Sequence, residues 1–345
     1  MKVAVLYPES ITCSWNMAHG LVATIKRMGH TVMPIGLPTE RSASDGRLAQ
    51  VKAACPPVQL LKDLDLILIS GPEHICPWMD AIYGRQAWAS LDVPKAAWLH
   101  ETKGRDDYEL DFDGFKWCAD HWFWTAIQDA EFHDQEMFAK GRSWWLPLGV
   151  DTKIFKPYGD RADGIHPIAF DCAFIGLVYP KRQAYLQALN RHKHPPIMIG
   201  STGAAHDLHG YHWEEGARLL ASNYRQIKVF FNLPALSRVL VSKVVEVMAC
   251  GTFLMTPQLP PDRGCDRNME PFTDGVHLKY YRSSNVPLVC QMLSEWISPE
   301  KDAERMLIAE AGCKIVHEKH SLEVRLRELM AKTLVGIEAD WAAKA

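Results

Sequence analysis

Short apolar segments alternate with longer amphipathic ones along most of the chain. In the first 150 residues the apolar runs are Val3–Tyr7, Thr31–Ile35, Leu64–Ser70, Lys95–His100, Trp122–Ala126 and Ser143–Leu148. Helix-like stretches lie between several of these runs, at Trp15–Met28, Trp78–Ser90 and Asp129–Lys140. Such alternation predicts a parallel sheet that is covered by helices on both faces.

The alternation stops near Asp151 and starts again after a stretch rich in Gly, Asp and Pro that ends at Pro167, which is typical of a domain boundary. Beyond it the strand patterns are Phe170–Ile175, Ile197–Ile199, Lys228–Asn232 and Phe253–Thr256. The helix patterns are Lys181–Arg191, Glu214–Ser222 and Ser242–Ala249. We therefore expect an α/β protein with two doubly wound domains, residues 1–157 and 158–320. Residues 321–345 are expected to form a C-terminal helix that packs back on the first domain.

Composition narrows the class of protein. The 345 residues are 48% hydrophobic and 23% charged, which is ordinary for a soluble globular protein. No segment approaches the roughly 20 apolar residues that span a bilayer, and the apolar run before Pro8 is too short for a signal peptide. The 9 cysteines form no Cys-x-x-Cys pair, so we expect reduced thiols in a cytoplasmic protein.

Charge is unevenly distributed between the two halves. Residues 1–150 carry a net charge of −5 and residues 151–345 a net charge of +2, which together give the overall −3. An acidic first half weighs against a large nucleic-acid-binding surface. The sequence contains neither G-x-G-x-x-G nor a P-loop, so dehydrogenase and kinase functions lack their motifs.

The segment from Ser242 to Thr256 carries the strongest chemical signal. It predicts a helix that ends at Gly251, where glycine suits the left-handed position after a helix, followed by a buried strand. A carboxylate at Glu246 that faces a cleft can accept two hydrogen bonds from a ribose diol. Lys243 lies on the same helix face, three residues earlier, and can meet a diphosphate. A surface Lys–Glu pair fits the pattern equally well.

Further polar groups follow the predicted strands, where open α/β sheets bind their ligands. Lys181 and Arg182 begin a helix, a favourable place for a diphosphate, although they could also be solvated cations. Ser201 and Thr202 follow a strand, and their backbone could approach a nucleotide base; a simple turn is the alternative.

In the first domain, His100 and Glu101 lie at the end of the predicted strand that begins at Lys95. We predict them as catalytic residues, with the histidine binding substrate hydroxyls or handling protons near pH 7. The carboxylate can act as a general base. An ordinary loop pair is the alternative interpretation.

Two other patterns favour structure over chemistry. His206, His209 and His212 recur at every third position, but Gly210 and the lack of a nearby carboxylate–cysteine set favour a loop over a metal site. Eight of the 12 tryptophans lie between Trp78 and Trp145, and most are expected in the core. One or two could stack on an acceptor ring.

Six segments, in the same order along the chain, resemble signature segments of group-1 glycosyltransferases. They are Lys26–Val32, Trp145–Pro157, Phe174–Gly176 with Lys181 and Arg182, Ser242–Thr256, Pro271–Val276 and Glu318–Arg325. The match spans residues 1 to about 330 and is closest to the branch similar to bacterial spore-maturation glycosyltransferases.

This resemblance implies the GT-B fold, in which two Rossmann-like domains face a central cleft. It also implies transfer of a sugar from a UDP- or GDP-sugar to a hydroxyl acceptor, with retention at the anomeric carbon. The N-terminal domain would bind the acceptor and the C-terminal domain the donor. The donor-binding residues it implies are Gly176, Lys181, Arg182, Ser201, Thr202, Arg238, Lys243 and Glu246. Because fixed cations can neutralise a leaving diphosphate, we expect neither a metal ion nor a cofactor.

The sequence departs from the family pattern at two positions. Arg238 stands where many members have a glutamate near the donor sugar, and Lys243 stands where arginine is usual. Lysine keeps the charge but loses the bidentate geometry. Loss of that glutamate keeps open a non-catalytic nucleotide-sugar-binding subunit.

The acceptor is left open by the sequence: a saccharide, a small molecule, a protein or a modified DNA base. A DNA-modifying glycosyltransferase that acts on a hydroxymethylated base would account for an aromatic-rich first domain, against its negative charge. A nucleotide-sugar epimerase can share the same fold.

Overall fold

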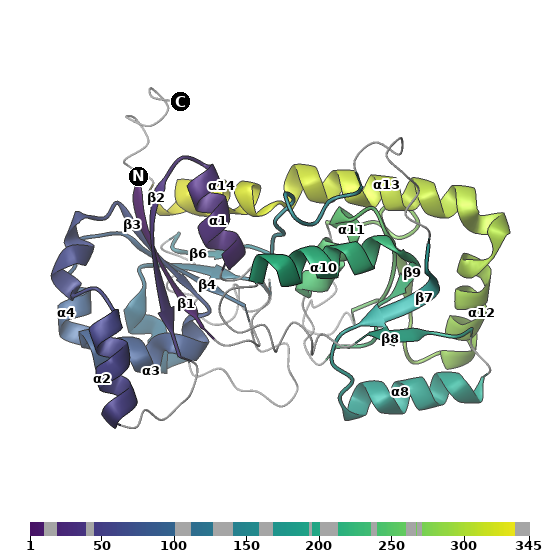
Figure 1. Cartoon of the computed structure of the whole chain (residues 1–345), viewed down its shortest axis with the longest axis horizontal. Coiled ribbons are helices and arrows are strands. Elements are labelled where there is room, and N and C mark those ends of the chain that lie inside the picture. Colours follow the sequence, from purple (N-terminus) through teal and green to yellow (C-terminus); the bar gives the residue numbers. More distant parts are fainter. Residues whose placement is uncertain are drawn as a thin grey trace. The chain divides into compact units, whose positions relative to one another are not determined.

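The computed structural model describes the chain except for residues 10–18, 39–44, 101–111, 127–140, 159–167, 193–194, 201–212, 236–239, 260–266, 268–270 and 335–345. It divides into two compact units, which we describe separately (Figure 1). Unit 1 comprises Met1–Leu148 and Leu322–Ala345, and unit 2 comprises Gly149–Ser321. The segment after Gly149 thus packs in unit 2: the Phe155 ring lies 6.3 Å from that of Tyr224.

Unit 1 is built on a parallel sheet whose six described strands run in the order β2-β1-β3-β4-β5-β6. The strands are β1 (Lys2–Pro8), β2 (Thr31–Leu37), β3 (Leu66–Ser70), β4 (Lys95–Leu99), β5 (His121–Trp124) and β6 (Ser143–Trp145). Each overlaps one of the predicted apolar runs, so the strand prediction for this half is confirmed. Pro34 is tolerated within β2 because β2 is an edge strand.

The helices of unit 1 differ more from their sequence patterns. They are α1 (His19–Arg27), α2 (Asp45–Ala54), α3 (Pro72–Tyr83), α4 (Arg85–Ala89), α5 (Phe112–Phe115) and α14 (Leu322–Thr333), with 3-10 turns η2 (Val58–Asp63) and η3 (Lys116–Cys118). The single helix predicted from Trp78 is wrong: α3 begins at Pro72, a residue favoured at the first helical position, and the chain turns at Gly84 before α4. The predicted helix Asp129–Lys140 lies outside the described residues.

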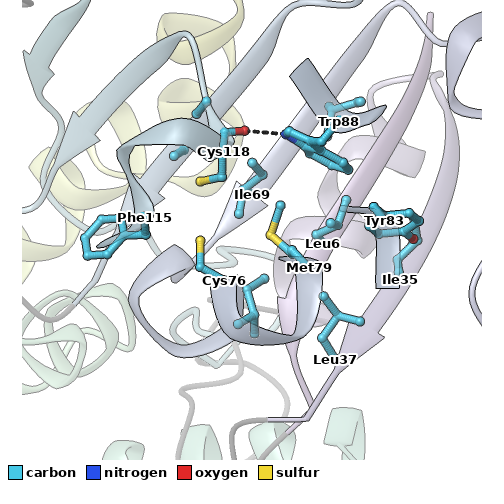
Figure 2. Packing of buried hydrophobic residues seen from close by; sticks show 14 of the residues in the cluster. Leu6, Ile35, Leu37, Ile69, Cys76, Met79, Tyr83, Trp88, Phe115 and Cys118 are labelled. Atoms are coloured by element: carbon cyan, nitrogen blue, oxygen red, sulfur yellow. Dashed lines mark hydrogen bonds between the residues drawn. The ribbon is translucent and has the colours of Figure 1, made fainter. Parts of the chain in front are cut away.

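Both faces of the unit 1 sheet are buried, as predicted. Successive residues of each strand point to opposite faces, so Ala4 and Leu6 belong to one core cluster and Val3 and Val5 to the other. The first cluster is covered by α3 and α4; Figure 2 shows Met79 of α3 packed close to Leu6 and Ile69. In the same view the Trp88 indole donates a hydrogen bond of 2.8 Å to the Cys118 carbonyl. The second cluster includes buried side chains of α1 and α14.

Unit 2 has a second parallel sheet, whose described strands run in the order β11-β10-β9-β7-β8. The strands are β7 (Phe170–Ile175), β8 (Met198–Gly200), β9 (Ile227–Phe231), β10 (Phe253–Pro257) and β11 (Lys279–Tyr281). The helices are α8 (Pro180–Arg191), α10 (Trp213–Arg225), α11 (Ser242–Ala249), α12 (Val286–Ile297) and α13 (Asp302–Lys319), with a 3-10 turn η6 (Pro299–Lys301). In Figure 1, α11 and α13 lie above the strands of this sheet and α8 lies below them. The four predicted strands and three predicted helices are confirmed, and β11 was missed.

The predicted glycine turn after α11 is confirmed. Gly251 has a φ of 72°, in the left-handed region that favours glycine. Its backbone N–H donates to the carbonyl of Met248 at 2.9 Å, and the N–H of Thr252 donates to Val247 at 3.3 Å. These bonds satisfy carbonyl groups at the end of the helix and lead the chain directly into β10.

The sequence analysis also expected reduced cysteines and no segment that spans a bilayer, and the described residues bear on both expectations. The seven cysteines in this part of the chain are free thiols, and five of them are buried. Among the described helices, none combines the length and the apolar character that a bilayer span requires.

Candidate functional site

Three of the predicted donor-binding residues meet at the carboxyl end of β7 in unit 2. The Lys243 ammonium donates a 2.9 Å hydrogen bond to the carbonyl of Ile175 and lies 4.4 Å from the centre of the Phe174 ring. Gly176 has a φ of 152°, and a Cβ there would collide with the Lys243 ammonium and lie 2.9 Å from Phe174. A Cβ at this position would therefore displace the Lys243 ammonium or the Phe174 ring, and the positive φ also disfavours other residues.

Arg182, in the first turn of α8, turns into the same place. Its side chain is buried, and the guanidinium lies 4.9 Å from the Phe174 ring centre and 4.5 Å from that of Tyr179. It donates to the carbonyl of Leu177 at 2.7 Å and to that of Pro234 at 3.1 Å. Lys181 is exposed, and no contact between described residues joins it to this group. The structure thus joins Arg182, but not Lys181, to Lys243.

The two cations share an environment that is short of negative charge. Among the described residues, neither Arg182 nor Lys243 has a carboxylate within 4.0 Å. Burial and repulsion from Arg182 lower the pKa of Lys243 to about 7, against the attraction of Glu246. Burial also lowers the pKa of Arg182. Uncompensated positive charge at the end of a parallel strand is suited to binding an anion.

Glu246 lies one helical turn beyond Lys243 and is enclosed. Its side chain is 4% exposed, and the hydroxyl of Tyr224 on α10 donates to its Oε2 at 3.3 Å. Burial, together with the negative charge of Glu246, raises the pKa of Tyr224 well above its usual value. A surface Lys–Glu pair is excluded by this burial. The role of Glu246 in binding the ribose stays a prediction. It requires the two ribose hydroxyls to reach a carboxylate that is only 4% exposed.

Asn232 is a polar residue of the same sheet edge that the sequence analysis did not single out. It directly follows β9 and is 3% exposed. Its side-chain nitrogen donates to Thr256 at 3.0 Å, and its backbone carbonyl accepts from the hydroxyl of Tyr281 at 2.5 Å. Its Oδ1 is buried and has no hydrogen-bond partner in the part of the chain that the structure describes. The sequence does carry a signal for this residue: a polar asparagine ends an apolar strand, two residues before Pro234.

In unit 1, His100 is held at the carboxyl end of β4 by three neighbouring segments. Its Nε2 lies 2.8 Å from the hydroxyl of Ser70, at the end of β3. Its backbone N–H donates to Glu73 at 3.1 Å, and its carbonyl accepts from the hydroxyl of Thr125 at 3.3 Å. The ring is 4% exposed, and its Nδ1 has no hydrogen-bond partner among the described residues.

Burial determines the charge state of His100. Loss of water around the ring, together with repulsion from His74, lowers the pKa of His100 to about 3. The imidazole is therefore neutral near pH 7. This lowered pKa argues against proton transfer by His100 at neutral pH, whereas a neutral hydrogen bond from or to its Nδ1 remains available.

The other predicted site residues cannot be placed. Glu101, Ser201, Thr202 and Arg238 lie outside the described residues, as do the three histidines at 206, 209 and 212. In the part of the chain that is described, no group of three or more His, Cys, Asp or Glu side chains could hold a metal ion.

The tryptophans of unit 1 are mostly core residues, as expected. Trp78, Trp88, Trp98, Trp122 and Trp124 are at most 2% exposed. Trp117, Trp144 and Trp145 pack partly buried against the two clusters. The five buried rings are therefore unavailable for stacking on a ligand.

Two of the segments that carry the family resemblance meet in unit 2. The Phe272 ring lies 4.9 Å from that of His320, whose carbonyl accepts from the Val150 N–H at 3.0 Å. Asp274 is bound within its own loop, by the N–H of Tyr280 at 2.7 Å and the ammonium of Lys279 at 2.8 Å. These segments hold unit 2 together.

Comparison with known proteins adds to this geometry. Residues 180–331 match a family model described as glycosyl transferase-like. That range includes Arg182, Lys243 and Glu246. No curated protein matches the sequence.

Solved structures resemble nearly the whole chain. Sucrose-phosphate synthase of Thermosynechococcus elongatus is 12% identical, with a TM-score of 0.63 over 100% of both chains. Anabaena Alr3699/HepE in complex with UDP is 14% identical, with a TM-score of 0.61 over 97% of this chain and 100% of the other. An α-glucosyltransferase in complex with UDP and a 13-mer DNA containing an HMU base is 10% identical, with a TM-score of 0.63 over 96% and 99%.

These likenesses fit the two parallel-sheet units described above. At such low identity they establish the fold, which is GT-B with two Rossmann-like units. The fold prediction is confirmed, and together with the family match it supports a glycosyltransferase.

Proposed function

We propose that this protein transfers a sugar from a nucleotide-sugar donor to a hydroxyl acceptor, and that unit 2 binds the donor. The observation that carries the proposal is the pairing of Arg182 and Lys243 on the Phe174 ring, without a carboxylate partner among the described residues. Both cations lie within residues 180–331, which match the glycosyl transferase-like model. The similar HepE structure contains UDP, a nucleotide with a diphosphate.

We assign a part of the reaction to each group. Negative charge develops on the leaving diphosphate as the glycosidic bond breaks, and fixed cations stabilise that charge more than the ground state. Arg182 and Lys243 supply these cations. Glu246 accepts hydrogen bonds from the ribose hydroxyls. In unit 1, neutral His100 offers Nδ1 to a substrate hydroxyl.

Finer features of the proposal come from the sequence resemblance. We place the enzyme in the branch similar to spore-maturation glycosyltransferases and expect it to retain the anomeric configuration. We also propose that it works without a metal ion or cofactor, since protein cations meet the diphosphate, and that it is cytoplasmic.

A DNA acceptor is the second candidate. Its favouring observation is the fold shared with the α-glucosyltransferase whose structure contains UDP and a modified 13-mer DNA. Burial of five tryptophans weakens the aromatic argument for it, and residues 1–150 carry a net charge of −5. An epimerase and a non-catalytic donor-binding subunit remain alternatives to transfer.

A nucleotide-sugar screen tests the proposal. UDP- and GDP-sugars are added to the full chain, and the rise in melting temperature reports binding by mass action. Release of free nucleoside diphosphate is then measured with saccharide acceptors and with hydroxymethylated DNA. We expect a stabilising donor whose turnover depends on an acceptor. A panel in which no nucleotide-sugar raises the melting temperature would contradict the proposal, and binding without turnover would favour the non-catalytic subunit.

The chain offers a matched pair of variants for this screen. Arg182→Ala removes the buried cation and Lys181→Ala the exposed neighbouring one. Only the first is expected to abolish the shift. Equal effects of the two substitutions would place the donor away from the Phe174 ring.

A further inference from the structure

One aromatic ring in unit 2 supports two positively charged side chains. The Phe174 ring is fully buried, with the Arg182 guanidinium 4.9 Å and the Lys243 ammonium 4.4 Å from its centre. The negative face of an aromatic ring attracts a cation, and more strongly where water is excluded. Phe174 thus holds together two groups that repel each other.

Arg182 also lies 4.5 Å from the centre of the Tyr179 ring, and among the described residues both cations donate their hydrogen bonds to backbone carbonyls. Lys243 donates to Ile175, and Arg182 donates to Leu177 and Pro234. A carbonyl oxygen fixes the position of a cation but carries only a partial charge. Both side chains are therefore oriented while their charge is not neutralised, which is the arrangement an anionic ligand completes.

The titratable groups around Lys243 can be named for each element that packs on it. Arg182 of α8 repels it, and Glu246 of its own helix attracts it. Tyr224 of α10 contacts Glu246 as a neutral phenol. Cys313 and His317 of α13 contact the carbonyl of Ala249, at the other end of α11. Strand β7 contributes Phe174 and the Ile175 carbonyl, neither of which titrates.

We propose that Phe174 is a positioning residue that holds Arg182 and Lys243 as a like-charged pair, and that Lys243 takes up a proton from solvent when a diphosphate binds. The proposal rests on the proposed function, because it places the donor diphosphate at this ring. The amine gains one proton, and the ligand supplies the negative charge that keeps it there.

The ligand-free state makes the uptake measurable near neutrality. With a pKa of about 7, Lys243 is partly deprotonated at pH 7.5 before the donor binds. A negative diphosphate next to the ammonium raises this pKa. Above pH 7 the affinity for the donor is expected to fall by up to about tenfold per pH unit. The reason is that Lys243 must then take up a proton from solvent each time a donor binds.

Calorimetry with UDP-glucose tests the linkage. Its two phosphates are both esterified, so the probe lacks the terminal phosphate proton that titrates near pH 6 in a monoester. At pH 7.5 the binding enthalpy is measured in buffers of different ionisation enthalpy. We expect the wild-type protein to take up most of a proton. Lys243→Arg should bind without uptake, because arginine stays charged, and Lys181→Arg should match the wild type.

A second pair of variants tests the ring itself. Phe174→Leu keeps an apolar side chain but removes the aromatic face, and we expect UDP-glucose affinity to fall about five- to thirtyfold. Phe253→Leu removes a similarly buried ring that stacks on Trp296. It should lower stability without changing affinity or proton uptake. Equal loss of affinity in both variants would reduce Phe174 to a packing residue.

A ligand-free measurement separates this inference from the proposed function. Between pH 7 and pH 10.5 the unfolded chain holds a proton on Lys243 that the folded chain has lost, so folding becomes more favourable as pH rises. The folding equilibrium constant of the wild type, relative to Lys243→Arg, should grow by up to about tenfold per pH unit in this window. If this pH dependence is observed but no nucleotide-sugar binds, the proposed donor site is wrong, whereas the inference that Phe174 holds two like-charged side chains is supported. If the wild type and Lys243→Arg show the same proton uptake and the same pH dependence of stability, the inference is overturned.

Discussion

At the carboxyl ends of β3 and β4 in unit 1, the buried polar groups are the imidazole of His100 and the hydroxyl of Ser70. At the carboxyl end of β7 in unit 2, the polar groups are the buried cation Arg182 and the half-buried cation Lys243. Burial lowers the pKa of a base in both places, to about 3 for His100 and to about 7 for Lys243. The histidine therefore loses its charge at neutral pH, whereas the lysine retains much of it.

The difference follows from what surrounds each base. Lys243 lies over an aromatic ring and near Glu246, both of which favour its charged form. Among the described groups, His74 adds repulsion to the burial of His100. One sheet edge is thus suited to recognising neutral hydroxyl groups and the other to binding an anion. The predictions below test this contrast, starting with the largest expected effect.

The largest effect is expected on turnover when a buried cation is removed. Arg182→Ala should lower the turnover number by about 10²–10³-fold, the usual loss for one group that stabilises transition-state charge. Binding of the free nucleoside, which lacks phosphate, should change little. Steady-state kinetics and calorimetry measure the two quantities. An equal loss in nucleoside affinity and turnover would show that Arg182 shapes the pocket rather than the reaction.

Next in size is the loss of the enclosed carboxylate. Glu246→Ala should weaken nucleoside diphosphate binding by about 1.5–3 kcal/mol, the range for hydrogen bonds to a charged group. Tyr224→Phe is the control, because it removes the 3.3 Å bond to Glu246 but leaves the carboxylate in place. Unchanged affinity in a folded Glu246→Ala protein would exclude the ribose role.

Gly176→Ala should separate strain from displacement of Lys243. Both Gly176 and Gly275 have positive φ values, 152° and 69°, but only at Gly176 would a Cβ collide with the Lys243 ammonium. Alanine at either position is expected to cost about 1–3 kcal/mol of stability through backbone strain. Only Gly176→Ala should also lower UDP-glucose affinity, by about tenfold. Normal affinity in that variant would mean that Lys243 does not need its present position.

The neutral state of His100 predicts how stability changes in mild acid. Below pH 6.5 the unfolded chain binds a proton that the folded ring, with a pKa of about 3, does not accept. Stability therefore falls as the pH drops, by about 1 kcal/mol between pH 6.5 and 5.5. Denaturant titrations should show this slope reduced in His100→Gln and retained in His192→Gln, which changes an exposed residue. The same slope in His100→Gln and the wild type would indicate a solvated, titrating imidazole.

The smallest expected effect is that of a chelator. If Arg182 and Lys243 neutralise the diphosphate, EDTA should leave turnover unchanged. Activity that is lost in EDTA and restored by manganese or magnesium would contradict the metal-independent mechanism, and would direct attention to His206, His209 and His212.

The fold was largely predictable because periodicity and glycine positions report local physics. Buried parallel strands appear as apolar runs, and the left-handed turn at Gly251 was readable from its place after a helix. The break at Gly84 and the three-residue strand β11 were missed. Segments this short contain too few residues to show a hydrophobic periodicity. The site was less predictable. Adjacent helical residues point about 100° apart, and the sequence does not say whether Lys181 or Arg182 turns inward.

Charge states were the least predictable feature of the site. The sequence placed His100 at the end of a strand, but its pKa depends on burial among Ser70, Glu73 and Thr125, which come from three other segments. Likewise, the role of Phe174 depends on two cations from α8 and α11 meeting on one ring. Such properties arise from tertiary packing and leave no local pattern in the sequence.

A crystal structure of the full chain with UDP-glucose tests the central claim most directly. The account predicts diphosphate oxygens within hydrogen-bonding distance of the Lys243 ammonium and the Arg182 guanidinium, with the ribose hydroxyls at Glu246. A nucleotide bound with its diphosphate away from the Phe174 ring, or at the His100 edge of unit 1, would contradict it.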